Sequence, residues 1–194
     1  GERANSIKAF IGFIVFFFII LNFTFKKKLI SSIIGFIILI GFISSSDFLK
    51  YRYFKQIKAM YSGINGNIYF KIYNSGFEVF KNYPITGVGN KNYRVESCKN
   101  YELKNNTYIC TTHPHQIYIE FLSEHGVIGC FLLFYIFYKL IFSKIKKIYM
   151  TRNPINLGAM IYLIFIFLPV IPSGAFFSDY SLTFFAINIS VLYA

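Results

Sequence analysis

The stretch "THPHQIYIEFLSEHGVIG" (residues 112–129) joins the most polar, titratable cluster of the chain to an apolar run that carries no charge before Lys139. Two histidines flank Pro114, an amphipathic turn follows, and the apolar run begins at Val127. An apolar run that crosses a bilayer as a helix places whatever precedes it at the bilayer surface. The stretch therefore predicts a polar, titratable site at the mouth of a membrane-spanning segment.

Composition indicates a membrane protein. Of the 194 residues, 55% are hydrophobic, 21% aromatic and only 14% charged, and a soluble domain of this kind would leave too much apolar surface in water. A membrane helix needs roughly 20 apolar residues. Five stretches are candidates, at residues 7–25, 29–45, 127–143, 155–171 and 182–194, the last cut short by the end of the chain. Buried helices of a large soluble protein are the alternative, but those have polar faces that these stretches lack. We therefore expect an all-α polytopic membrane protein with about five transmembrane helices.

The short loops predict the orientation, because Lys and Arg are retained on the cytoplasmic side. "KKK" (residues 26–28) separates the first two stretches, and "KIKK" (residues 144–147) with Arg152 separates the third and fourth. If both are inside, residues 1–45 hold two helices, 46–126 form a large periplasmic loop, and 127–194 hold three helices. The loop is itself basic, but loops longer than ~60 residues translocate largely regardless of charge. The start "GERANS", without a methionine, suggests a fragment of a longer polytopic protein, and the lysines after the first apolar run argue against a signal peptide.

The large loop is predicted to be mostly helical. "DFLKYRYFKQIKAMYSG" (residues 47–63) has apolar and basic residues at helical spacing, typical of a helix in the lipid headgroup layer or of one packed on the protein's own surface. A second helix should end before Pro84. "PITGVGN" (residues 84–90) then predicts a tight turn at Gly87 and Gly89, which either presents backbone N–H groups to an anion or is only a turn.

Two cations follow this turn, and two cysteines follow the cations. Lys91 and Arg94 are spaced so that both could hold a phosphate, although a solvated basic loop would look the same. Cys98 and Cys110 close a short loop that a disulfide would stabilise in an oxidising compartment. Metal binding is the weaker alternative, because the nearby histidines match no standard zinc spacing. Cys130 reads as a small buried hydrophobe.

His115 is the candidate base. Pro114 suits the first turn of a helix and Thr112 its cap, so His115 would lie near a helix N-terminus, one turn before Tyr118 and Ile119. A positive helix end disfavours imidazolium, which keeps the ring neutral and able to accept a proton. A lone histidine is more often structural, and that alternative stays open on the residues alone.

The motifs together resemble the C-terminal half of the bacterial O-antigen ligase and O-antigen polymerase superfamily. The resemblance lies in "YPITGVGNKNYR" (residues 83–94), in "THPHQIYIEFLSEHGVIG" and in "IPSGAFFSDYSLTFFA" (residues 171–186), and it covers essentially the whole chain. "GERANS" resembles an arginine-bearing stretch at the outer end of an earlier helix in such proteins.

This resemblance implies an inner-membrane glycosyltransferase of lipopolysaccharide biosynthesis that needs no metal or other cofactor and binds no nucleic acid. The donor would be a glycan on undecaprenyl pyrophosphate, and the acceptor a lipid A core sugar. The alternatives are a repeat-unit polymerase and a protein O-oligosaccharyltransferase. The transfer needs cations for the pyrophosphate and a base for the acceptor hydroxyl. Carried over, His115 is the base, while Arg3, Lys91 and Arg94 contact the pyrophosphate.

Two positions depart from the family pattern. Many relatives carry a further arginine well before the glycine turn, and "SGINGNIYFKIY" (residues 62–73) has none, so that Lys71 is the nearest cation. Gln116 replaces the more usual asparagine. A transporter or lipid-scaffold subunit is the non-enzymatic alternative. A transporter would place ionisable residues along a pathway within the spans, whereas a lipid scaffold would not need them. Apart from Lys8 and Lys139 near their ends, the spans carry no charge.

Overall fold

The computed structural model describes residues 2–55, 68–99, 108–169 and 171–194, and this part of the chain folds as helices joined by turns. The all-helical class expected from the sequence is confirmed for these residues. In chain order the elements are α1 (Glu2–Ile20), α2 (Phe25–Ser45), α3 (Asp47–Lys50), the π-helical turn η1 (Tyr51–Lys55), α5 (Ile68–Asn82), α6 (Tyr93–Cys98), α7 (Ile117–Phe142), α8 (Ile145–Thr151), α9 (Pro154–Ile166) and α10 (Asp179–Tyr193).

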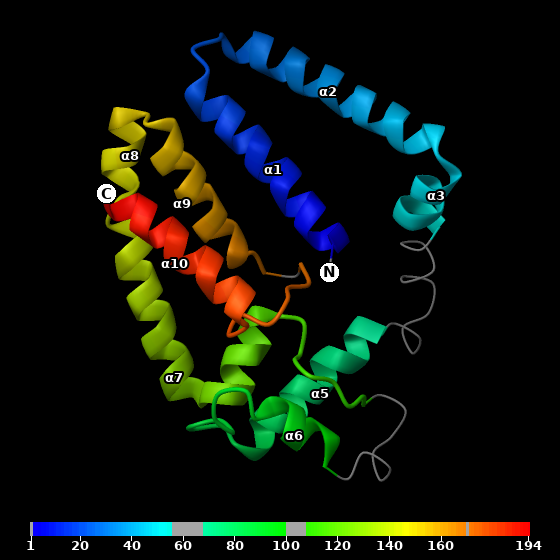
Figure 1. Cartoon of the computed structure of the whole chain (residues 1–194), viewed down its shortest axis with the longest axis vertical. Helices are drawn as coiled ribbons and strands as arrows, with labels where there is room; N and C mark the ends of the chain where they lie inside the picture. The colour runs from blue at the N-terminus through cyan, green and yellow to red at the C-terminus, as the bar shows by residue number, and fades with distance from the viewer. Residues whose placement is uncertain (1, 56–67, 100–107, 170) are drawn as a thin grey trace.

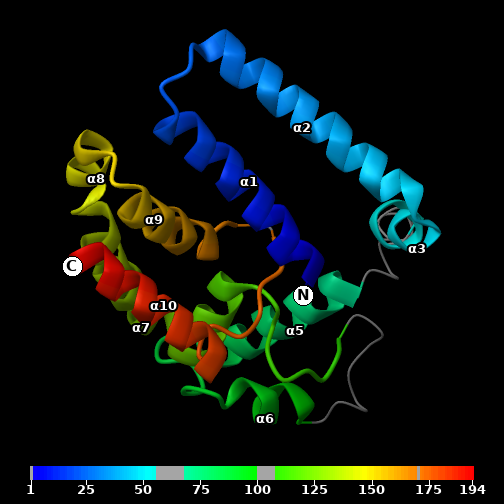
Figure 2. The ribbon, with the colours of Figure 1, turned by 45° about the horizontal axis from the view of Figure 1, so that its top comes forward.

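The long helices α1, α2, α7, α9 and α10 form three groups (Figure 1). The α1–α2 hairpin forms one side, α7 the opposite side, and α9 and α10 lie between them, with α9 packed on both α1 and α10. Helices α5 and α6 cross the lower end of α7, and the turned view keeps them at that end (Figure 2). The α1–α2 connection and α8 lie at the other end. The fold therefore consists of a body of apolar helices, as in membrane proteins, with a polar layer at one end.

Two helical segments of the described chain are long and apolar enough to cross a membrane: α2 and the stretch Ile117–Thr151, which comprises α7 and α8. Ala4–Ile20 and Pro154–Ile166 are apolar but shorter. The predicted first span at residues 7–25 is displaced, because α1 ends at Ile20 and α2 already begins at Phe25. Lys26, Lys27 and Lys28 consequently lie in the first turn of α2 rather than between helices.

The predicted fourth span, residues 155–171, is wrong as a single helix. Helix α9 ends at Ile166, and thirteen residues at ~1.5 Å each cover only about two thirds of a bilayer core. Pro169 and Pro172 explain the end, because proline donates no backbone hydrogen bond and its ring clashes with the preceding turn. The chain then forms an irregular turn before Ser178 caps α10 by accepting a hydrogen bond from Ser181 N at 3.2 Å.

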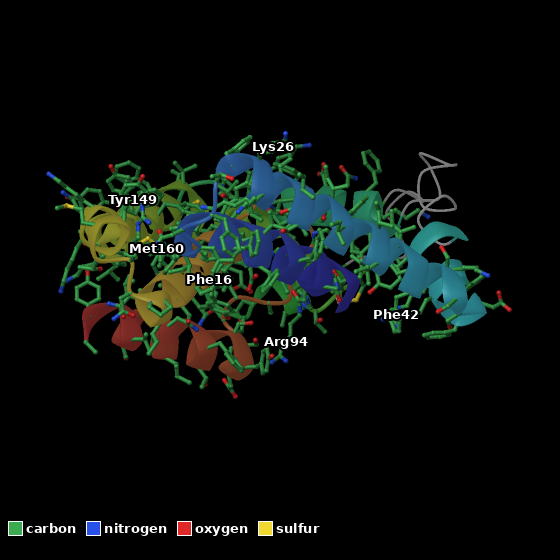
Figure 3. The ribbon with its side chains drawn as sticks, turned by 90° about the horizontal axis from the view of Figure 1, so that it is seen from above. Phe16, Lys26, Phe42, Arg94, Tyr149 and Met160 are labelled. Carbon is green, nitrogen blue, oxygen red and sulfur yellow. A yellow bond between two sulfur atoms is a disulfide. The ribbon has the colours of Figure 1, made fainter. Side chains whose placement is uncertain are left out.

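An aromatic cluster fills the centre between α7, α9 and α10. Phe121 is fully buried and Phe176, from the turn before α10, is 3% exposed; their rings meet edge to face at 5.2 Å. Figure 3 shows Phe16 of α1 and Met160 of α9 in the interior of this body, with Phe42 of α2 at its outer edge. Phe42 is 66% exposed and no residue of α2 is buried by the described chain. The turn at residues 171–178 is thus anchored in the core, whereas α2 is not.

Candidate functional site at the lower end of α7

A backbone crossing organises this end of the molecule. The glycine turn predicted at residues 84–90 lies across α7, where Val88 N donates to Ser123 O at 3.0 Å and Gly89 N to Glu124 O at 2.8 Å. In return, Val127 N donates to Pro84 O at 2.9 Å. A fourth backbone hydrogen bond runs from Ile128 N to Ile85 O. Together the four bonds fix the glycine turn to α7.

Two glycines make this crossing possible. Gly126 interrupts α7 with φ of 62°, and a Cβ atom there would lie 2.2 Å from Ile85 O. A Cβ atom on Gly87, whose φ is 68°, would lie 2.3 Å from the carbonyl carbon of Glu124. Only glycine combines a positive φ with this close approach. The turn forms at the predicted residues 84–90, but its N–H groups at positions 87, 88 and 89 bind protein carbonyls and are not free to cradle an anion.

The crossing builds one wall of a groove with a volume of about 490 Å³. Lys91 and Arg94 follow the turn, His113 comes from the segment before α7, and the turn before α10 closes the far side. Figure 3 shows Arg94 pointing outward beside the start of α10. The residues that line the groove are Lys91, Arg94, Thr112, His113, Glu120, Glu124, Ala175, Phe177, Ser178 and Asp179.

Glu120 and Glu124 are the residues that sequence analysis missed. They stand one turn apart on α7, and they are only 2% and 4% exposed. Both carboxylate oxygens of Glu120 accept from Phe176 N, at 3.0 and 2.9 Å, so Glu120 ties the turn before α10 to α7. The backbone N–H groups of Lys91 and Tyr93 face the Glu124 carboxylate. The sequence did carry a signal for these residues, namely two acids at i and i+4 next to an apolar run. Acids beside a membrane-spanning segment are costly and usually have a functional role.

The two histidines differ in position. His113 lines the groove, whereas His115 is not among the lining residues and packs edge to face on Tyr69 of α5, with ring centroids 6.2 Å apart. Their two rings touch, with centroids 4.0 Å apart. His115 has φ of 52°, and a left-handed conformation costs ~1–3 kcal/mol in a residue other than glycine. Its carbonyl accepts from Ser173 N at 2.8 Å, which holds this conformation in place.

The predicted start of the helix at Pro114 is wrong. Helix α7 begins at Ile117, and Gln116 caps it by accepting from Ile119 N at 2.9 Å, so Thr112 is not the cap. Thr112 instead bonds Nδ1 of His113 at 3.1 Å. Burial is the largest reason that the pKa of His115 is lowered, and a hydrogen bond to the Ser173 backbone opposes it. Burial, with the neighbouring His115, lowers the pKa of His113 to about 4. Both rings are therefore neutral at pH 7, chiefly through burial rather than through a helix end.

The remaining predicted cations are less closely placed. Arg3 lies in the first turn of α1, but its side chain is outside the described residues. Lys71 is half-buried on α5 and does not line the groove. Lys91 Nζ lies 3.8 Å from Asp179 Oδ1, and both side chains are exposed. The structure therefore brings Lys91 and Arg94 together with His113, and it leaves Lys71 apart.

A disulfide between Cys98 and Cys110 fixes the segment that leads to the histidines, with Cα atoms 4.7 Å apart. Beside it, Ser97 Oγ donates to Thr111 O at 2.9 Å, and Ile109 N donates to Ser75 Oγ at 2.8 Å. Cys130 is free and half-buried on α7. The disulfide and these hydrogen bonds attach residues 108–111 to both α5 and α6, and so position His113.

Comparison with known families identifies the chain. The model of the O-antigen ligase family matches residues 2–134. The chain belongs to the O-antigen ligase family. The matched range contains the glycine turn, both histidines, both buried glutamates and Arg3, and it ends within α7 before the turn that closes the groove. A search of curated proteins finds no match. Membership of this family implies a transferase of the O-antigen ligase type. Together with the apolar helices, it indicates a membrane protein.

Proposed function

We propose that this O-antigen ligase family member transfers a glycan from undecaprenyl pyrophosphate to a hydroxyl of a lipid A core sugar, at the lower end of α7. His115 removes the proton from the acceptor hydroxyl, and that oxygen forms a bond to the anomeric carbon of the donor. The bond between this carbon and the pyrophosphate oxygen breaks, and undecaprenyl pyrophosphate leaves with the bonding electrons. Lys91, Arg94 and Arg3 stabilise the charge on the leaving group.

The observation that carries this proposal is the groove itself. It joins Lys91 and Arg94, which follow the glycine turn, to His113, whose ring touches that of His115. These residues come from two separate family motifs, and both lie within the matched range. Cations beside a neutral imidazole are what a transfer with a pyrophosphate leaving group requires, because the donor brings its own activated bond.

We further propose that the groove lies on the periplasmic side of the membrane. Arg152 donates to Asn22 Oδ1 at 2.7 Å, which ties the turn after α8 to the α1–α2 connection. The basic residues 26–28 and 144–152 therefore lie together at one end, and the groove lies at the other (Figure 1). Short basic segments stay in the cytoplasm, which supports a periplasmic groove.

The test replaces His115 in the full-length protein within its native membrane. We expect His115→Ala to lower transfer by ~10²–10⁴-fold, because a positioned base is lost, with membrane insertion and protein level unchanged. His113→Ala should be milder. Arg94→Lys should retain part of the activity that Arg94→Ala loses, because an ammonium cannot reproduce the bidentate guanidinium contact. Lys146→Ala, at the opposite end, is the matched control for lost positive charge.

The readout is lipopolysaccharide carrying the glycan, compared with the length of unligated glycan chains. Near-normal transfer by His115→Ala together with loss in His113→Ala would move the base to His113. Activity in both variants would end the enzymatic interpretation of this site. Loss of chain length rather than of attachment to lipid A would indicate a polymerase.

A further inference from the structure

Two residues that line the groove each carry a buried polar atom with no hydrogen-bond partner among the described residues. These atoms are Oε2 of Glu124 and Nε2 of His113. Glu124 is only 4% exposed. An unpaired carboxylate oxygen at such depth costs ~1–3 kcal/mol or more unless something occupies the site. These two atoms therefore point to a ligand that offers hydrogen bonds.

The charges around Glu124 favour a neutral ligand. Asp179 supplies an exposed carboxylate to the groove, Glu120 and Glu124 supply two buried carboxyl groups, and Lys91 and Arg94 supply two cations. Lys91 already lies 3.8 Å from Asp179, while Arg94 extends outward at the rim. A phosphate next to the Glu124 oxygen would be repelled, because like charges a few ångströms apart in a partly dry site are strongly unfavourable. A hydroxyl group can donate to that oxygen without this penalty.

We propose that the inner part of this groove binds the acceptor sugar, with a sugar hydroxyl donating to Glu124 Oε2 and a second polar group meeting His113 Nε2. Phe177, half-buried in the groove wall, offers an apolar surface to the carbon face of the ring. This assignment rests on the proposed function and adds the residues of the groove that hold the acceptor sugar. Pyrophosphate contacts stay with the cations at the rim, and His115, whose ring touches that of His113, keeps its role as the base for the acceptor hydroxyl.

The surroundings of Glu124 suit a fixed binding group. The N–H groups of Lys91 and Tyr93 hold one side of the carboxylate, and the crossing at Gly87 and Gly126 fixes the backbone on both sides of it. Its free oxygen therefore has a set direction before any ligand arrives, which reduces the entropic cost of binding. A metal ion is the other ligand that carboxylates accept, but no group of three suitable ligands occurs among the described residues.

The first experiment measures kinetics of the full-length enzyme in nanodiscs, with an undecaprenyl-pyrophosphate-linked glycan as donor and lipid A core as acceptor. Glu124→Gln keeps an oxygen for the two N–H groups and removes the charge. We expect the KM for the acceptor to rise about 10- to 100-fold, with the KM for the donor within about twofold, because a hydrogen bond to a charged group is weakened. Glu78→Gln, which removes a partly exposed carboxylate paired with Lys81 on α5, is the matched control and should change neither constant.

The second experiment measures binding without donor or turnover, and so separates this inference from the proposed function. Saturation-transfer NMR with delipidated core oligosaccharide should show contact with the wild-type protein and with Glu78→Gln, and a signal reduced at least fivefold for Glu124→Gln. Should Glu124→Gln not fold, His113→Gln replaces it with the same expected direction. A rise in the donor KM alone, unchanged oligosaccharide binding in these variants, or binding that disappears with EDTA would each overturn the assignment.

Discussion

Helix α2 and the first half of α7 differ in what they bury. None of the 21 residues of α2 is buried by the described chain, although the helix is predominantly apolar after its first turn. In and before the first half of α7, the buried residues include Gln116, Glu120, Ser123 and Glu124. Apolar side chains that remain exposed need an apolar solvent, while buried polar groups need hydrogen-bond partners. The position of α2 therefore depends on its surroundings, and that of α7 on contacts within the chain.

This difference shows in which region the fold depends on the identity of individual residues. Sliding or rotating α2 would change few contacts, since an added Cβ atom at Gly35 or Gly41 would meet nothing within 4 Å. The same addition at Gly87 or Gly126 would meet backbone atoms. The polar end is thus the part of the molecule in which a single methyl group matters.

The largest expected effect comes from replacing one glycine in each of the two regions by alanine. Gly126→Ala should destabilise the protein by about 3–5 kcal/mol, because it combines a left-handed backbone with a clash against Ile85. Gly41→Ala should be neutral or should stabilise by up to about 1 kcal/mol through helix propensity. Thermal unfolding of the purified protein in detergent measures both. Equal effects at the two positions would mean that the crossing is not formed.

A second test exchanges polarity. Ile37→Asp, at a side chain that is 62% exposed on α2, should cost about 2.5–3.5 kcal/mol of membrane insertion, read from protease accessibility of the residues after α2. Glu120→Leu should cost about 1–3 kcal/mol of unfolding free energy, because Phe176 N loses its acceptor, and Glu120→Gln should restore much of it. Normal insertion of the Ile37→Asp variant would show that α2 faces water or protein rather than lipid.

The comparison also explains what the sequence could predict. Apolar runs located the helices, because burial in lipid depends on composition over a whole segment. Pro84 ended α5 as expected, and the Cys98–Cys110 disulfide is present. These features depend on local residue types or on short separations along the chain.

The groove could not be predicted in the same way. It depends on bonds between distant residues, such as Val88 N to Ser123 O and Phe176 N to Glu120, and such bonds leave no periodic pattern. The left-handed backbone of His115 is set by Ser173 from the far end of the chain. The predicted cations and histidines were therefore found by type, while the acids beside them became visible only in the fold.

A third test concerns the disulfide, which belongs only to the polar region. Its loop spans a sequence separation of 12, and closing a loop of this length stabilises by about 2–3 kcal/mol. Cys98→Ser or reduction should lower the unfolding free energy by that amount and should leave the insertion of α2 unchanged. In the native protein a non-reducing digest should give one linked peptide, and a thiol reagent should label Cys130 only. Labelling of all three cysteines would contradict the pairing.

The smallest expected effect is a pH dependence confined to the polar region. Burial lowers the pKa of His113 to about 4, from the ordinary value of 6.5, so the unfolded chain binds a proton more readily than the folded one. This contribution to stability is fully present above pH 6.5 and is lost as the pH falls toward 4. For a half-buried ring, partly screened by water, the loss at pH 5 should be about 1 kcal/mol relative to pH 7.5. His113→Gln, which cannot titrate, should lack this loss, and melting temperatures of both proteins at pH 7.5, 6 and 5 provide the measurement. Parallel curves for the two proteins would mean that water or a ligand group reaches Nε2 of His113 and keeps its pKa near the ordinary value.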